Sequence, residues 1–208
     1  MRIAFIVFFV FIVGNSKAGE YGKSCKNCLD HLKVGNSIIK EFEEQYKEIK
    51  TISATFKQVS EDNSVITGEF YLKKPNKIIW KYLKPYPVII LINGNVLTYY
   101  DQKLDEISYK NVKDSIFSVI LGKNSNLSSK IISTSIKGSL KQITFKDQFL
   151  DEPFTLRFFF TSSPFILKKL SLNDSNQELS NITFTNFHKN VAIDDKKFTI
   201  SRKFLKRN

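Results

Sequence analysis

Most of this chain repeats one pattern, in which apolar and polar residues alternate over short segments. Ile66, Phe70 and Leu72 share one face of such a segment. Thr67 and Lys73 share the opposite face. A period of two residues is typical of a β-strand that is buried on one side. A chain of this kind must pair its strands side by side and cover the apolar face that they form together.

Turn residues divide the pattern into separate strands. Asn93-Gly94 is a strong hairpin signal, and Pro75-Asn76 and Ser163-Pro164 are turn signals of the same kind. About eleven short, hairpin-linked strands predict an antiparallel barrel or a strongly curved sheet in one α+β, mostly β, domain. The predicted strands are 54–59, 66–73, 78–82, 88–92, 96–100, 130–136, 140–146, 154–161, 166–172, 182–187 and 197–201.

Two short helices accompany the strands. Ser37 can cap a first helix, whose apolar residues, such as Phe42 and Tyr46, recur at three- and four-residue steps. Asp114-Ser115 can cap a second, mostly apolar helix over 116–121. Both helices must bury apolar surface, and the concave face of the sheet is where they can do so. The residues alone leave open whether that interior is solid or encloses a cavity.

The N-terminus has the features of an export signal. Arg2 is followed by an unbroken apolar run, Ile3–Val13, and by Ser16-Lys17-Ala18, which places small residues around a cleavage bond. The run is shorter than the roughly 20 residues that span a bilayer. We therefore predict a signal peptide over 1–18, cut after Ala18. An uncleaved membrane anchor is the alternative.

Residues 19–36 are predicted to form a tether that contains both cysteines, Cys25 and Cys28. A C-x-x-C motif is typical of redox catalysis when it follows a strand and opens a helix, and no strand precedes it here. A local disulfide or two inert thiols remain the alternatives. Residues 37–208 are then a single domain.

Composition narrows the possible partners and chemistry. The formal charge of +12 favours contact with anionic surfaces such as acidic proteins or phospholipid headgroups, and a basic face that only keeps the protein soluble is the alternative. An exported protein rarely meets nucleic acid. No catalytic motif is present, and Asp194-Asp195 is typical of a solvated turn. We predict no enzyme activity, no metal and no cofactor.

The middle of the chain contains a series of short motifs: Ala54-Thr-Phe-Lys-Gln58, Gly68-Glu-Phe-Tyr-Leu-Lys-Lys-Pro-Asn76, Trp80, Pro85, Asn93-Gly94-Asn95 and Tyr100-Asp101. In these motifs the chain resembles the LolA family of periplasmic lipoprotein carriers. The resemblance spans residues 38–121, and the Lys-Pro-Asn…Trp spacing is its most specific part.

The resemblance implies an incomplete antiparallel β-barrel lidded by short α-helices, with a cavity for acyl chains between them. It implies a periplasmic monomer that carries acylated lipoproteins from an inner-membrane ABC-type release complex of the Lol system to an outer-membrane acceptor. Ordinary core packing is the alternative for each expected site residue. The expected cavity wall is Ile78, Trp80, Phe56, Phe70, Leu72, Ile90 and Leu97, and the expected lid residues are Phe42, Tyr46, Phe117 and Ile120.

The chain departs from the family at Lys74, where the family usually has an arginine that latches the lid to helix backbone. Lys74 falls on the same face as Phe70 and Leu72, so a latch is possible. The alternative is that the turn at Pro75 lets the side chain reach water. Lysine offers three donors on a flexible stem where arginine offers five fixed ones, so we expect a weaker latch.

Three other functions compete with this one, and the second lacks a residue that it needs. The first is a lipid- or lipoprotein-sensing regulatory module of the RseB type on the same fold. The second is the membrane-anchored acceptor LolB, which would need a lipid-modified cysteine at the cleavage site, where Ala18-Gly19 has none. The third is an exported enzyme whose catalytic groups meet only in space.

Overall fold

The computed structural model describes residues 28–60, 62–113, 115, 117, 120–121, 130–149, 152–173 and 179–200. The predicted signal peptide, Cys25 and Asp114 lie outside the described residues. The elements are α1 (Cys28–Lys47), β1 (Thr51–Val59), β2 (Val65–Lys73), β3 (Lys77–Tyr82), β4 (Val88–Asn93), β5 (Val96–Asp101), β6 (Glu106–Asn111), β7 (Ile131–Lys137), β8 (Leu140–Phe149), β9 (Glu152–Ser162), β10 (Phe165–Asn173), β11 (Leu179–Lys189) and the 3₁₀ helix η2 (Asp195–Phe198).

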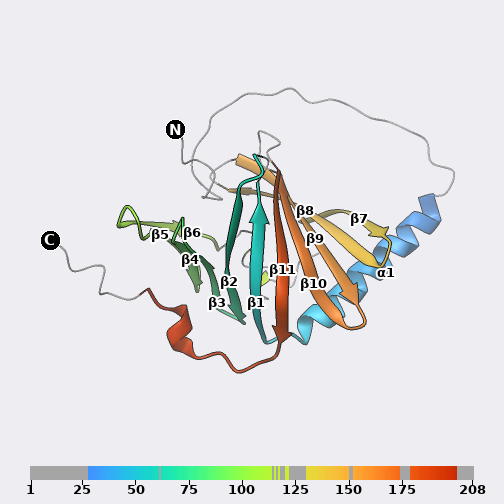
Figure 1. Ribbon diagram of the computed structural model, residues 1–208. Helices are drawn as coiled ribbons and strands as arrows, with labels where there is room; N and C mark the ends of the chain where they lie inside the picture. Colours follow the sequence, from blue (N-terminus) through green and yellow to red (C-terminus); the bar gives the residue numbers. More distant parts are fainter. Residues whose placement is uncertain are drawn as a thin grey trace.

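The strands form one open antiparallel sheet in the order β6-β5-β4-β3-β2-β1-β11-β10-β9-β8-β7. Consecutive strands pair from β1 through β6, and again from β7 through β11, and β6 and β7 are the two edges of the sheet. The two runs meet where β1 pairs with β11 at the centre of the sheet. Figure 1 shows the sheet curving around α1. The predicted fold class, mostly β with an incomplete antiparallel barrel of about eleven strands and a helical lid, is confirmed.

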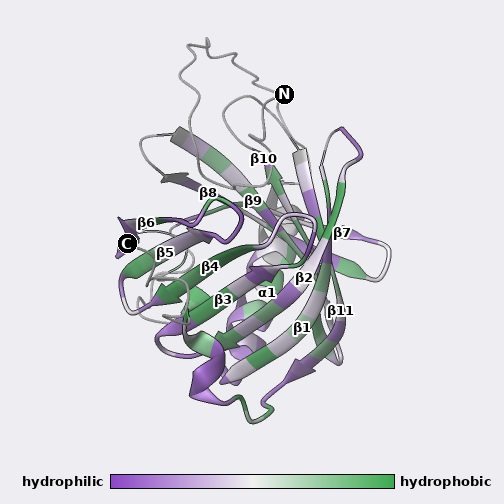
Figure 2. Cartoon of the chain, turned by 60° about the vertical axis from the view of Figure 1, so that its left-hand side comes forward, coloured by the Kyte–Doolittle hydropathy of each residue, from purple (hydrophilic) through white to green (hydrophobic). Residues whose placement is uncertain are grey.

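The two faces of the sheet carry two separate apolar clusters. The inner cluster lies on the face that α1 covers and draws residues from β1 to β5 and β8 to β11. The outer cluster consists of Ile79, Ile89, Leu91, Tyr100 and Phe198. Successive side chains of a strand point to opposite faces, so the apolar run of β4 supplies residues to both clusters. Figure 2 shows apolar and polar bands along other strands, such as β1 and β2.

The first helix begins earlier than the sequence predicts. It starts at Cys28 and runs through Gly35 and Asn36, so Ser37 lies inside the helix and is not its cap. Glycine costs about 1 kcal/mol relative to alanine inside a helix. Packing explains its presence, because a Cβ at Gly35 would lie 3.0 Å from the Oγ1 of Thr134 in β7. Gly35 therefore permits close approach to the sheet.

Two strand assignments differ from the prediction. Glu106–Asn111 forms the edge strand β6, which the pattern leaves unassigned because most of its residues are exposed on both faces. The predicted strand at 197–201 is wrong, since Lys197 and Phe198 belong to η2, capped by the Asp194 side chain. In the predicted helix over 116–121, Phe117 and Ile120 are helical, and its other residues, apart from Leu121, lie outside the described part of the chain.

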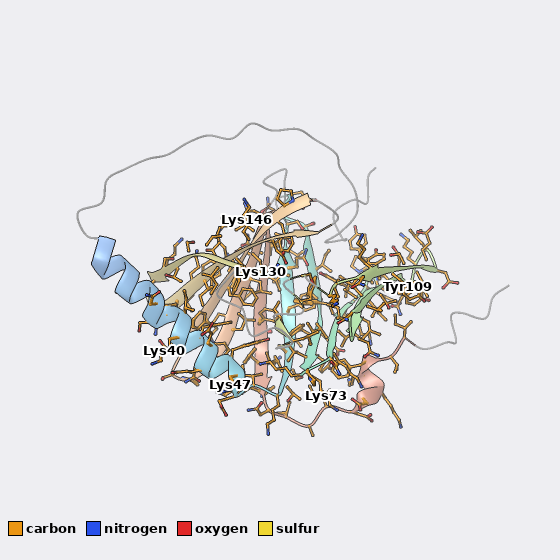
Figure 3. The ribbon with its side chains drawn as sticks, turned by 180° about the vertical axis from the view of Figure 1, so that it is seen from behind. Lys40, Lys47, Lys73, Tyr109, Lys130 and Lys146 are labelled. Atoms are coloured by element: carbon orange, nitrogen blue, oxygen red, sulfur yellow. The ribbon has the colours of Figure 1, made fainter. Side chains whose placement is uncertain are left out.

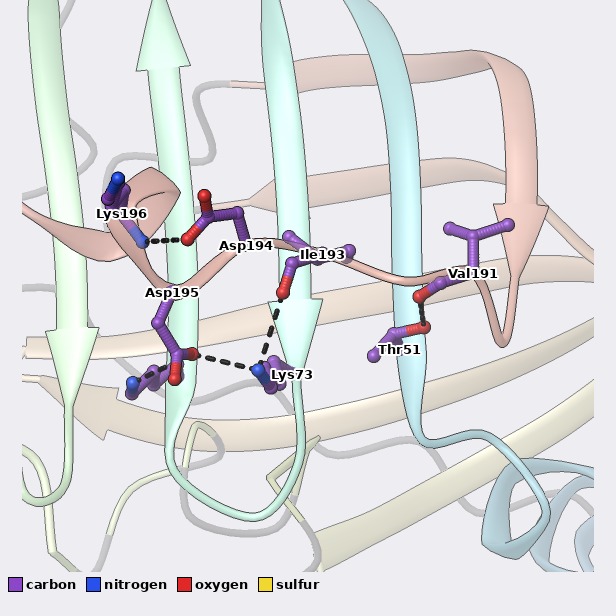
Figure 4. Close-up of polar contacts among 8 residues, drawn as sticks. Thr51, Lys73, Val191, Ile193, Asp194, Asp195 and Lys196 are labelled. Atoms are coloured by element: carbon purple, nitrogen blue, oxygen red, sulfur yellow. Dashed lines mark hydrogen bonds and ion pairs between the residues drawn. The ribbon is translucent and has the colours of Figure 1, made fainter.

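The segment after β11 crosses the outer face and is fixed there by charge and apolar contact. Asp195 accepts hydrogen bonds from Lys73 and Lys77 at 2.8 and 3.0 Å, as Figure 4 shows for this segment. These two bonds hold the pKa of the Asp195 carboxyl below its usual value. Phe198 is 3% exposed in the outer cluster. Asp195 is thus a structural charge on the outer face.

Within the part of the chain that the structure describes, no helix is long and apolar enough to cross a membrane.

Candidate functional site

Helix α1 places an aromatic plug on the inner face. It contacts β7, β8 and β9, and Figure 3 shows it, with Lys40 and Lys47 labelled, at the opposite end of the sheet from Tyr109 in the edge strand β6. Phe42 of α1 is 2% exposed. Its ring lies 5.2 to 6.5 Å, centroid to centroid, from four phenylalanines of β8, β9 and β10: Phe145, Phe158, Phe160 and Phe165. One helical side chain therefore fills this half of the inner face.

An ion pair fastens the middle of α1 to the sheet. Lys141 of β8 donates a hydrogen bond to the carboxylate of Glu41. This bond holds the pKa of Glu41 below its usual value. Because Glu41 precedes Phe42 directly, the pair fixes the helix next to the plug.

A lysine holds the end of α1. Lys74, just beyond β2, donates from Nζ to the carbonyl oxygen of Tyr46 at 2.5 Å. The same Nζ lies 3.7 Å from the centroid of the Tyr46 ring, which places the cation over the aromatic face. Partial burial lowers the pKa of Lys74 from 10.5 to about 8. The contact joins the sheet rim to helix backbone.

Tyr46 connects α1 to the second predicted lid segment. Its hydroxyl donates to the carbonyl oxygen of Ile120 at 2.6 Å, and its ring stacks on Phe42 at 5.3 Å. Burial raises the pKa of the Tyr46 hydroxyl. Phe117 and Ile120 are partly buried against the inner cluster. The four expected lid residues thus lie together over the inner face.

A row of paired residues crosses the other half of the inner face. Phe70, Trp80, Ile90 and Tyr99 are direct neighbours on β2, β3, β4 and β5. Phe70 and Ile90 are buried, whereas Trp80 and Tyr99 remain partly exposed. Helix α1 contacts β7, β8 and β9, so this row lies away from the helix on the inner face.

The remaining expected wall residues also lie in the inner cluster. They are Phe56, Leu72, Ile78 and Leu97, each at most 4% exposed. The structure therefore brings every expected wall and lid residue into one cluster. Their role in ligand binding stays a prediction.

The inner face carries few polar groups. Gln58 is 2% exposed, donates from Nε2 to the Ser180 hydroxyl at 2.8 Å and accepts from the Tyr82 hydroxyl at 2.9 Å. The described residues contain no group of three or more histidine, cysteine or acidic side chains that could hold a metal ion. Such a face can bury an apolar group.

Sequence reasoning missed the phenylalanines of β8 to β10 and the ion pair between Glu41 and Lys141. The phenylalanines could have been found, because Phe158 and Phe160 alternate with polar or partly exposed positions in β9. The ion pair has no local signal, since its partners are 100 residues apart.

Comparison with known proteins gives one family match. The profile of the family described as "Outer membrane lipoprotein carrier protein LolA" matches residues 47–201. An outer-membrane lipoprotein carrier protein of Helicobacter pylori (strain HPAG1) is 28% identical over 170 residues, which cover 80% of this chain and 83% of that protein. An uncharacterized protein of Rickettsia prowazekii is 25% identical over 122 residues, and the match covers 56% of this chain and 57% of that protein.

A solved structure is also similar. The LolA superfamily protein of Nitrosomonas europaea superposes with a TM-score of 0.45 at 11% identity, over 80% of this chain and 97% of that one. A likeness this remote supports no argument about function.

Proposed function

The chain belongs to the LolA family of outer membrane lipoprotein carrier proteins, and on that premise we propose that it carries acylated lipoproteins between membranes. The carrier works in the periplasm, which it reaches through a cleaved signal peptide. It receives its cargo from an inner-membrane ABC-type release complex and delivers it to an outer-membrane acceptor. Binding involves no covalent chemistry.

The observation that carries the proposal is the aromatic plug. Phe42 is held among four phenylalanines by a helix that the side chains of Lys74 and Lys141 fasten to the sheet. Such a helix can be displaced without breaking the sheet. The inner face beneath it is apolar, as an acyl chain requires.

Competition between plug and cargo explains how a carrier can release what it binds. Burial of an acyl chain is worth about 0.8 kcal/mol per methylene, so a chain of roughly sixteen carbons gains about 12 kcal/mol. Displacing the lid costs the contacts of Phe42 and Tyr46 and those of Phe117 and Ile120. The net affinity is the difference between these two burials, and a modest difference permits transfer to the next partner.

Lys74 sets how firmly the empty carrier closes. Its hydrogen bond to the Tyr46 carbonyl favours the closed form, and its loss of hydration opposes it. The two effects partly cancel. The latch is therefore weaker than one in which a guanidinium donates several fixed hydrogen bonds.

The test is release of a triacylated lipoprotein from membrane vesicles that contain the inner-membrane release complex, supplied with ATP, when the purified mature protein is added. The wild type should solubilise the lipoprotein as a one-to-one complex that native mass spectrometry detects. Ile78→Glu, on the inner face, should abolish release because it places a charge on the proposed wall. Ile79→Glu is the control, since this neighbour is 3% exposed but belongs to the outer cluster. Retained release by folded Ile78→Glu removes Ile78 from the site, and absence of release by the wild type refutes the proposal.

A further inference from the structure

The indole N–H of Trp80 is buried without a hydrogen-bond partner. Among the described residues, nothing accepts a hydrogen bond from Trp80 Nε1. The ring is packed by Phe70 at 4.4 Å, Phe56 at 6.3 Å and Phe184 at 6.4 Å, centroid to centroid. All three neighbours are hydrocarbon rings, which offer no oxygen to a donor.

This arrangement is costly in the form that the structure shows. A buried donor without an acceptor costs about 1–3 kcal/mol, and a buried tryptophan usually finds a partner for its N–H. Nearby polar groups demonstrate that the fold can satisfy such demands. Gln58, on β1 two strands away in the sheet, uses both ends of its amide, towards Tyr82 and Ser180. Among the described residues, Trp80 Nε1 and Ser162 Oγ are the two buried side-chain polar atoms without a partner, and only Trp80 lies in the row on the inner face.

The position of Trp80 indicates that a bound ligand can supply the missing acceptor for its N–H. Trp80 is the only tryptophan of the chain. It lies in the cross-strand row of the inner face, between Phe70 and Ile90, and its side chain stays partly exposed. A ligand laid along this row would meet the ring. If it carries an oxygen acceptor, it can pair with the donor that the protein leaves unpaired.

We propose that the Trp80 indole N–H donates a hydrogen bond to a carbonyl oxygen of the bound acyl group. This inference rests on the proposed function and makes it more specific. An acyl chain carries its carbonyl next to the hydrocarbon, at an ester or amide linkage, so one ligand can fill the apolar row and satisfy Nε1. Trp80 thereby distinguishes an acyl group from plain hydrocarbon of the same length. Nε1 has no hydrogen-bond partner in the closed form, so no protein hydrogen bond is broken when it donates to the ligand. The hydrogen bond is therefore made only when cargo is bound.

The experiment compares two ligands that differ in the acceptor. Methyl palmitate and hexadecane, delivered from cyclodextrin, compete with a fluorescent fatty acid bound to the mature protein. The wild type should prefer the ester over the alkane by about fivefold to tenfold, the range expected for one hydrogen bond to a buried donor. Trp80→Phe keeps a ring and removes the donor, and it should bind both ligands equally. Phe70→Leu is the matched control, because it alters packing on Trp80 without removing a donor and should keep the preference.

A second measurement uses the unmodified protein, so the result does not depend on how a variant folds. The single indole N–H gives one resonance in a ¹H–¹⁵N spectrum, and it should move downfield with methyl palmitate but not with hexadecane. If both ligands bind and the resonance does not respond to methyl palmitate, or if Trp80→Phe keeps the ester preference, the Trp80 inference is refuted while the proposed function stands. If neither ligand displaces the fluorescent fatty acid, both are refuted.

Discussion

Replacing the plug residue Phe42 with alanine should tighten ligand binding while it destabilises the protein. Removal of a buried phenylalanine costs about 3–5 kcal/mol, and Phe42, with four phenylalanine neighbours and 2% exposure, belongs at the upper end of that range. If the plug must leave before cargo enters, part of this free energy no longer opposes binding. Recovery of about 1.4–3 kcal/mol corresponds to roughly tenfold to a hundredfold tighter binding.

The assay is titration of a fluorescent fatty acid, with urea unfolding of the same preparations. Phe198→Ala is the matched control: it removes an equally buried phenylalanine, 3% exposed, from the outer cluster. Both variants should lose stability, and only Phe42→Ala should bind more tightly. If Phe42→Ala binds no better than Phe198→Ala at comparable stability, Phe42 is an ordinary core residue and the competition between plug and cargo does not exist.

Three further outcomes test other parts of the structure. Burial lowers the pKa of Lys74 from 10.5 to about 8, so between these pH values the closed form binds fewer protons than an opened form with hydrated Lys74. The closed form should therefore become more stable as the pH rises from about 8 to 10.5. Amide hydrogen exchange in α1, corrected for the intrinsic exchange rate, should slow over the same interval. Lys74→Met should remove this pH dependence, and a wild type without it contradicts the latch geometry. Gly68→Ala should cost about 1–3 kcal/mol in urea unfolding, since its Cβ would clash with the backbone oxygen of Lys81 and lie 2.5 Å from the Phe56 ring, and an unchanged midpoint would disprove these contacts. Tyr82→Phe should cost about 1–3 kcal/mol by leaving the Gln58 carbonyl oxygen without its donor, and a fully stable variant would show that this oxygen finds another.

Periodicity predicted the interior strands well because a strand buried on one face has alternating apolar and polar residues. Ile66, Phe70 and Leu72 show this pattern, and β2 follows it. The edge strand Glu106–Asn111 has little burial on either face, so it leaves no such pattern. The start of α1 was missed because Ser37 is a residue type that caps helices, whereas the helix begins at Cys28 and Gly35 within it lies against β7.

The candidate site was predictable only in part, for related reasons. Strand parity placed Lys74 on the inner side, and its contact with the end of α1 follows from that position. The pairing of Glu41 with Lys141 depends on how the two halves of the sheet meet around α1, and single-sequence periodicity carries no such information. The missing partner of Trp80 Nε1 is likewise a three-dimensional property.

Photo-crosslinking from the two faces of the sheet tests the central claim most directly. Tyr99 packs with the inner cluster and Tyr71 with the outer one, and each is partly buried, so replacing either with p-benzoylphenylalanine is a comparable change. The account predicts that irradiation in the presence of a triacylated lipoprotein crosslinks the acyl chains to position 99 and not to position 71. Crosslinks from position 71 alone, or from neither position while the lipoprotein is bound, would contradict it.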